Sequence, residues 1–299
     1  MSIFKFFDFE GSLQKNILFK KVVSCKRKMR NPLKENAEKN LQDCYTSFMK
    51  DNLEYQTIFF DDDIVLVNKK SGFLTASDRH DSESPRLDLA LEKEFGKLFA
   101  VHRIDKDASG IVLYAKNENA QAELSKQFDS GSVKKVYHCL VNGHPYWDNL
   151  HVDLKLLADG DYRHRTVTNK KFGKVAITDF KNLGSCGPYS WIGALPQTDR
   201  TNQIRAHLLA NDLTIVCDPL YSGNQKPVRL SDIKRKYNGD TEVERPLLSR
   251  LALHAYSLEF KHPVNGQLLT FTAPYPKDME AVRKQLAKIF KVDPLGTDS

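Results

Sequence analysis

Short β-strands separated by turn signals run along most of this sequence. Runs rich in β-branched and aromatic residues are bounded by Gly, Pro, Asn and Asp, a pattern typical of strands joined by tight turns. We predict strands at 55–60, 64–67, 111–115, 135–141, 175–180, 189–195, 251–260 and 268–273. Asn265-Gly266 lies between the last two, and this dipeptide strongly favours a β-hairpin. We expect so many strands to pair with one another in sheets.

Helical patterns are fewer and are interspersed among the strands. Leu87, Leu91 and Phe95 recur at a spacing of four and predict one helix. Asn117 is a favoured N-cap residue and predicts the start of a second. The remaining helical patterns lie at 201–209 and 278–290. We therefore predict an α+β fold with a mixed, mainly antiparallel sheet and flanking helices.

The net positive charge is distributed unevenly along the chain. Residues 1–50 contain eleven Lys/Arg and five Asp/Glu, so they hold six of the seven net positive charges of the 299-residue chain. We predict a basic N-terminal extension at 1–50, one catalytic domain at 51–290 and a short tail at 291–299. A basic extension suits a polyanion such as RNA. A solvated terminus has the same composition, so both interpretations stay open.

Several classes of protein are disfavoured by motifs that are absent. The sequence has no G-x-G-x-x-G or G-x-x-x-x-G-K motif and no histidines at metal-ligand spacing, so we expect neither a cofactor nor a metal. No run of 18 apolar residues predicts a membrane span, and the first residues lack the features of a secretory signal. The five cysteines lie far apart without zinc spacing, which favours reduced thiols in a cytoplasmic protein; they are Cys25, Cys44, Cys139, Cys186 and Cys217.

A charged cluster directly precedes one of the apolar strands. His102, Arg103 and Asp105 lie just ahead of Ser109-Gly110 and the strand at 111–115. For an isolated Asp, turn capping is the more common explanation. The alternative is a catalytic carboxylate with supporting residues around it.

Several segments together resemble the RluA-type pseudouridine synthases. HRIDKDASG at 102–110 resembles that family's H-R-L-D-x-x-T/S-S-G signature, and KVY at 135–137 is similar to its K-x-Y strand. Four further segments match family elements in the family's order; they are VNKKSGFLT (67–75), TDRTNQIRAHL (198–208), CDPLYSG (217–223) and RLALHAYSLEFKHPVNG (250–266). The departures are Lys70 for a usual Pro, Asp199 for a usual Gly and Asn202 for a usual His, together with a rewritten loop at 211–214.

The resemblance implies a single pseudouridine-synthase-like catalytic domain with a central RNA-binding cleft. It implies isomerisation of uridine in ribosomal or transfer RNA, without a cofactor, by a protein that we expect to be a monomer. Asp105 is then the catalytic carboxylate, and Arg205 holds it ionised by lowering its pKa. Tyr137 stacks on the flipped base or helps to move the C5 proton. Asp107 is assigned to turn structure only.

The remaining predicted site residues contact RNA. The resemblance implies that Arg103 fills the gap left by the flipped base, while His102 supports the site by hydrogen bonding. The helix at 201–209 and the residue before it supply the others, which are Arg200, Thr201, Asn202 and Gln203.

Two other functions remain open from the sequence. A non-catalytic RNA-binding protein of the same fold is the first, although such a protein would be expected to have lost Asp105, Tyr137 or Arg205. A glycosidase or nucleosidase is the second, although such enzymes usually need two working carboxylates. For the isomerase itself, attack by the carboxylate on C1′ and removal of the 2′ proton are both open routes.

Overall fold

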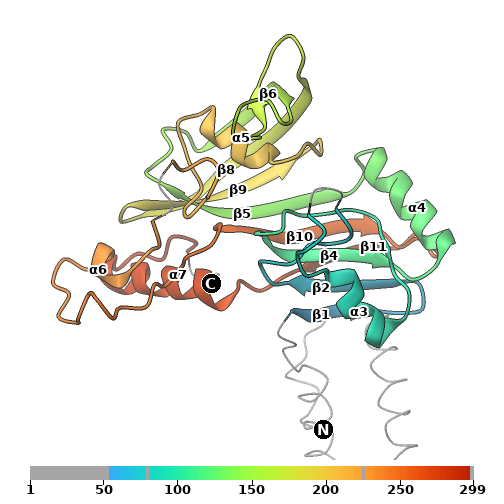
Figure 1. Ribbon diagram of the computed structural model, residues 1–299, viewed down its shortest axis with the longest axis horizontal. Helices are drawn as coiled ribbons and strands as arrows, with labels where there is room; N and C mark the ends of the chain where they lie inside the picture. Colours follow the sequence, from blue (N-terminus) through green and yellow to red (C-terminus); the bar gives the residue numbers. More distant parts are fainter. Residues whose placement is uncertain (1–53, 79–80, 224–225, 297–299) are drawn as a thin grey trace, which may run out of the picture. The chain divides into compact units, whose positions relative to one another are not determined.

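The computed structural model describes residues 54–78, 81–223 and 226–296, so the predicted extension at 1–50 lies outside the described residues. Eleven strands of the described part form one sheet (Figure 1), in the order β1-β2-β4-β10-β5-β9-β8-β6-β7, with β3 beside β4 and β11 beside β10. Their bounds are β1 Tyr55–Phe60, β2 Ile64–Lys69, β3 Phe99–Ala100, β4 Ser109–Ala115, β5 Lys134–Asn142, β6 Asn149–Leu157, β7 Val167–Thr168, β8 Lys174–Cys186, β9 Tyr189–Pro196, β10 Leu253–Lys261 and β11 Leu268–Thr272. All neighbouring strands are antiparallel except β4 and β10. The predicted α+β fold with a mixed, mainly antiparallel sheet is confirmed.

The helices lie at or near the predicted positions. They are α3 Leu87–Phe95, α4 Glu118–Asp129, α5 Gln203–Leu209, α6 Leu230–Ile233 and α7 Lys277–Phe290. Asn117 is the N-cap of α4, and its side-chain oxygen accepts a hydrogen bond from the Ala120 N–H at 2.9 Å. Helix α5 packs against β6, β8 and β9 (Figure 1). Within the described ranges, no helix has the length and apolar character needed to cross a membrane.

Strand β4 is buried along its whole length, and β2 is buried along most of it. Every residue of β4 is buried, as are Ile64 to Val67 of β2. Strands covered on both faces read as continuous apolar runs, which explains why the sequence predicts them clearly. These strands give the loop that precedes β4 a rigid base.

Gly110 allows β4 and β10 to approach each other closely. It pairs with Ala255 in the short parallel register, and its φ is +118°. A Cβ atom at this position would lie 2.2 Å from the Ala255 carbonyl oxygen, so only glycine fits. The close approach places the loop at 101–108 beside the start of β10. The loop that carries Asp105 is therefore held against the centre of the sheet.

Candidate active site

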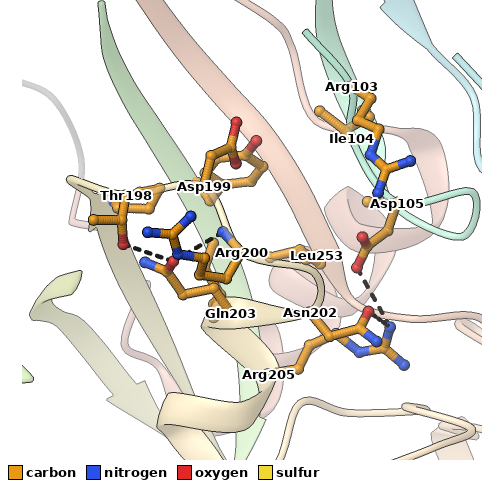
Figure 2. Close-up of a pocket in the computed structure, with 14 residues that line it drawn as sticks. Arg103, Ile104, Asp105, Thr198, Asp199, Arg200, Asn202, Gln203, Arg205 and Leu253 are labelled. Atoms are coloured by element: carbon orange, nitrogen blue, oxygen red, sulfur yellow. Dashed lines mark hydrogen bonds and ion pairs between the residues drawn. The ribbon is translucent and has the colours of Figure 1, made fainter. Parts of the chain in front are cut away.

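One pocket brings together the three residues predicted to be catalytic. Asp105 reaches it from the loop before β4, Tyr137 from β5, and Arg205 from α5. Leu253 at the start of β10 and the turn at 198–200 supply further walls (Figure 2). The pocket therefore forms where distant parts of the chain converge on the middle of the sheet.

Asp105 and Arg205 face each other across this pocket. Asp105 Oδ2 lies 3.3 Å from Arg205 Nη1 (Figure 2). The rest of the guanidinium is held by Asp218, through Nε to Oδ2 at 2.8 Å and Nη2 to Oδ1 at 2.7 Å. Asp218 is fully buried and Arg205 is 5% exposed, whereas the Asp105 side chain is 30% exposed. Arg205 is thus fixed by one carboxylate, and the other is left accessible to a ligand.

The pKa of Asp105 is raised above its ordinary value. The increase is caused mainly by removal of the carboxyl from bulk water. The guanidinium of Arg205 lowers this pKa, and the Asp218 carboxylate raises it. The expectation that Arg205 lowers this pKa has the right sign for that one interaction. The predicted net decrease is wrong, because desolvation raises the pKa of Asp105 by more than Arg205 lowers it.

Tyr137 forms a buried wall of the pocket. It is 8% exposed, and its strand β5 is paired with β9 and β10 on either side. Burial raises the pKa of the Tyr137 hydroxyl, and the carboxylates of Asp199 and Asp105 raise it further. The hydroxyl therefore stays protonated at neutral pH and is a hydrogen-bond donor to whatever enters the pocket.

Of the predicted RNA-binding residues, three point outward at the rim. The Arg103 side chain is 69% exposed and lies 3.5 Å from Asp78. Arg200 and Thr201 are exposed, and Arg200 Nε donates to the Val175 carbonyl oxygen at 3.0 Å. These side chains are placed to meet a ligand that extends beyond the pocket.

Gln203 and His102 differ from these three residues, because both make hydrogen bonds within the protein. Gln203 is 4% exposed, accepts from the Thr198 hydroxyl and the Arg200 N–H, and donates to the Ile177 carbonyl oxygen. His102 Nε2 accepts from the Leu113 N–H at 2.9 Å. Burial lowers the pKa of His102 to about 4, so its ring is neutral. Both therefore support the shape of the site.

Asn202, which stands where the family usually has His, supports Arg205. Its side-chain oxygen accepts from Arg205 Nη1 at 2.6 Å. Its φ of 53° is in the left-handed region, which Asn tolerates better than most residues. Asn202 therefore helps to aim the guanidinium at Asp105.

Three residues of the site were not singled out from the sequence, namely Lys69, Asp218 and Tyr221. Asp218 fixes Arg205, and the Tyr221 ring lies 5.0 Å from the same guanidinium. Lys69 is fully buried, and its Nζ donates to the carbonyl oxygens of Lys106, Ala108 and Lys70 at 2.9, 2.7 and 3.1 Å. All three lie in segments that match the family, which was the signal available. Their contacts depend on distant parts of the chain.

Lys69 anchors the loop that carries Asp105, so we expect Lys69→Met to impair turnover. Two of its three acceptors flank Asp107, two positions beyond Asp105. Without the ammonium, buried carbonyls lose their partner and the loop is free to shift. We expect kcat to fall roughly tenfold to hundredfold with little change in KM, as misplacement of a catalytic group does. Steady-state kinetics measures both constants.

The control for this variant is Lys93→Met, which removes an exposed lysine of α3. It should leave both constants unchanged. A rise in KM with normal kcat for Lys69→Met would contradict the positioning role.

One cluster of potential metal ligands occurs among the described residues, outside the pocket. Asp61, Asp63 and His262 have ligand atoms within 4.8 Å of one another. Their hydrogen bonds account for the arrangement, because His262 Nε2 pairs with Asp61 at 2.9 Å while Nδ1 accepts from the Val264 N–H at 3.3 Å. The cluster therefore joins the hairpin of β10 and β11 to the turn between β1 and β2.

Comparison with known proteins places this arrangement in a family. The profile of the RNA pseudouridylate synthases matches residues 63–210. The dual-specificity RNA pseudouridine synthase RluA of Vibrio vulnificus is 33% identical over 239 residues, covering 76% of this chain and 87% of the relative. The ribosomal large subunit pseudouridine synthase D of Neisseria meningitidis is 30% identical over 240 residues. That match covers 78% of this chain but 61% of the longer relative.

Solved structures share the fold. The human RNA pseudouridylate synthase domain containing 4 superimposes with a TM-score of 0.58 at 20% identity, over 77% of this chain and 92% of that one. The fold, the profile and the relatives therefore agree with the motifs that surround the pocket. This chain belongs to the RluA-type RNA pseudouridylate synthases.

Proposed function

We propose that this chain isomerises uridine to pseudouridine in ribosomal or transfer RNA, with Asp105 as the catalytic carboxylate. The observation that carries the proposal is the arrangement of Asp105 in the pocket, where a fixed guanidinium faces it and its own carboxyl remains accessible. The relative named for the ribosomal large subunit supports ribosomal RNA, and the relative named for dual specificity supports a second class of RNA.

The chemistry needs one bond broken and one formed within the same nucleotide. The N1–C1′ bond breaks, the uracil turns, and C5 bonds to C1′; C5 then loses its hydrogen and N1 gains one. Breaking the first bond leaves an electron-poor sugar carbon, which the Asp105 carboxylate stabilises by attack or relieves by taking the 2′ proton. Both routes require Asp105 to be ionised, and Arg205 favours that form.

The other residues hold the base and exclude water. The Tyr137 ring and Leu253 offer apolar walls for a flipped uracil, and the protonated Tyr137 hydroxyl is available to donate to it. Arg103, Arg200 and Thr201 meet the RNA at the rim. RNA bound across the rim covers the pocket and keeps the detached base from being lost to hydrolysis.

We also propose the boundaries and setting of the enzyme. The catalytic domain spans 51–290, preceded by a basic extension at 1–50 that adds affinity for RNA and followed by a tail at 291–299. The proposal includes action as a monomer. The cysteines of the described part are free and buried, which supports a reducing, cytoplasmic setting.

The experiment that tests the function uses unmodified ribosomal and transfer RNA transcripts, kept apart. Each is incubated with the protein, digested to nucleosides and analysed by chromatography, which separates pseudouridine from uridine. Pseudouridine in either fraction is the expected result and identifies the RNA class. Its absence from both, with folded protein that binds the RNA, would favour the non-catalytic RNA-binding protein.

The raised pKa of Asp105 predicts the acid side of the pH–rate profile. Activity requires the ionised carboxylate, so kcat/KM rises with pH through the pKa of Asp105. Because burial raises that pKa, the midpoint should lie above the ordinary value of 3.8. Single-turnover rates measured across the acid range give the midpoint. A midpoint at or below 3.8 would show that Arg205 outweighs desolvation.

Folding must be followed in the same pH series. Burial lowers the pKa of His102, His138, His207 and His254 to about 4, so these rings are neutral in the fold. In the unfolded chain these histidines take up protons below about pH 6.5, whereas in the folded protein they do so only near pH 4. The free energy of unfolding therefore falls as the pH is lowered through this window. Circular dichroism at each pH reports unfolding, so activity lost by unfolding can be distinguished from activity lost by protonation of Asp105.

A further inference from the structure

Two large aromatic side chains are largely exposed in the loops around β7. Tyr162 is 89% exposed and Phe172 is 66% exposed. They lie in the loops on either side of β7, one before Val167 and one after Thr168. Isolated exposed aromatics need no explanation. Here, however, basic residues surround both.

The positive charge of the domain is concentrated in the same segment. Residues 155–174 carry four more basic than acidic side chains; these are Lys155, Arg163, Arg165, Lys170, Lys171 and Lys174 against Asp159 and Asp161. The whole of 51–299 has an excess of only one, so the rest of it is acidic on balance. Exposed aromatic rings among cations are the composition of surfaces that bind single-stranded nucleic acid.

Both loops are already shaped by internal hydrogen bonds. Asp161 Oδ1 accepts from the N–H groups of Arg163 and Arg165, both at 3.0 Å. Asn169 Oδ1 accepts from the N–H groups of Lys171 and Phe172 at 3.0 and 2.9 Å. Binding of a ligand here therefore costs little entropy for ordering the loops.

The loop with Tyr162 is joined to the Arg205 guanidinium through Tyr221. The Tyr221 hydroxyl donates to the Thr166 carbonyl oxygen at 2.9 Å and accepts from the Thr166 N–H at 3.0 Å. The Tyr221 ring lies 5.0 Å from the Arg205 guanidinium and 5.7 Å from that of Arg165. One aromatic ring thus separates the site from this loop.

The second loop leads into the rim of the pocket. Arg200 lines the pocket, and its Nε donates to the carbonyl oxygen of Val175, close after Phe172 and Lys174. An RNA strand that leaves the pocket past Arg200 therefore meets this surface next.

We propose that this surface, formed by Tyr162, Arg163, Lys170, Lys171, Phe172 and Lys174, binds the unpaired nucleotides that flank the target uridine. Bases stack on the rings of Tyr162 and Phe172, and phosphates face the lysines and Arg163. The strand is unpaired because a duplex hides the faces of its bases, whereas loops and ends expose them. The inference rests on the proposed function for its substrate, and it adds a preference for uridines in single-stranded RNA.

The test measures binding of a fluorescently labelled single-stranded oligouridylate to the full chain. Tyr162→Ala with Phe172→Ala should weaken binding by about tenfold or more for each ring removed. Tyr162→Phe with Phe172→Tyr keeps both rings and should bind like the unmodified protein. This conservative pair shows whether weaker binding reflects stacking.

The matched control is Tyr146→Ala. Tyr146 is 85% exposed but precedes β6, whereas Tyr162 follows it. A nine-residue strand separates the two ends by roughly 27 Å. This control should bind normally. Equal weakening by Tyr146→Ala, or normal binding by the double alanine variant, would overturn the proposal.

Two further readouts separate this inference from the catalytic proposal. Lys170, Lys171 and Lys174 changed to Gln should reduce the slope of log affinity against log salt by about 0.7 for each lysine that neutralises a phosphate. With a base-paired RNA as probe, the double alanine variant should bind about as well as the unmodified protein. If the unmodified protein forms pseudouridine but the double variant has a normal KM for the RNA, the surface is wrong and the function stands. If binding follows the predicted pattern without turnover, the surface stands and the function fails.

Discussion

We expect Asp105→Asn to abolish pseudouridine formation while RNA binding persists. The change keeps the shape of the side chain but removes the anion that both possible routes need. We expect the single-turnover rate at saturating RNA to fall by at least about a thousandfold, the scale on which loss of a catalytic nucleophile or base is felt. Affinity for RNA should change little, because Arg103, Arg200 and the basic residues of 155–174 are untouched.

The matching control is Asp107→Asn, two positions along the same loop. Asp107 is assigned to turn structure, so this variant should retain activity close to that of the unmodified protein. Its Lys69-bound neighbours Lys106 and Ala108 keep the loop in place. Loss of activity in Asp107→Asn with normal activity in Asp105→Asn would show that the catalytic residue has been assigned to the wrong carboxylate.

We expect Arg205→Met to have the second large effect, on both stability and turnover. The buried carboxylate of Asp218 loses its bidentate partner, and Asp105 and Asn202 lose theirs. Removing one member of a buried ion pair typically costs about 3–5 kcal/mol. The pKa of Asp105 should rise further, because the one guanidinium that opposes desolvation is gone. Denaturant unfolding measures the first effect and the pH–rate profile the second.

Arg250→Met is the control for this variant. Arg250 also makes a bidentate pair with an aspartate, to Asp278 at 2.6 and 2.7 Å, and its side chain is 18% exposed. It lies outside the pocket, so its loss should reduce stability without moving the acid limb of the pH–rate profile. An unchanged limb in Arg205→Met would contradict the electrostatic role of Arg205.

Local patterns in the sequence predicted most elements of the fold. The hairpin at Asn265-Gly266, the cap at Asn117 and the apolar runs of β2 and β4 each depend on nearby residues, and each lies where it was predicted. The parallel pairing of β4 with β10 was not predicted. Residues about 145 positions apart make it, and Gly110 reveals the need for close approach only in three dimensions.

The site was predicted in part for the same reason. Asp105, Tyr137 and Arg205 carry the resemblance to the family and are found in one pocket. The contacts of Lys69 and Asp218 bridge separate segments, so no local pattern distinguishes them from other charged residues. Gln203 looked like an RNA contact on a short helix, yet its amide is used within the protein, because the turn at 198–200 needs hydrogen-bond partners.

The sign of the pKa shift of Asp105 shows a further limit of the sequence. A neighbouring Arg suggests a lowered pKa, and the sequence gives no measure of how much water is removed from the carboxyl. The structure supplies that quantity, and it reverses the net direction.

The most direct test of isomerisation at this site follows an RNA carrying tritium at uracil C5 and carbon-14 in the uracil ring. Forming the C5–C1′ bond expels the C5 hydrogen but keeps the base attached. We therefore predict release of tritium into water, in proportion to pseudouridine formed, with all carbon-14 retained in the RNA. Release of free carbon-14 uracil would contradict isomerisation and identify a hydrolase instead.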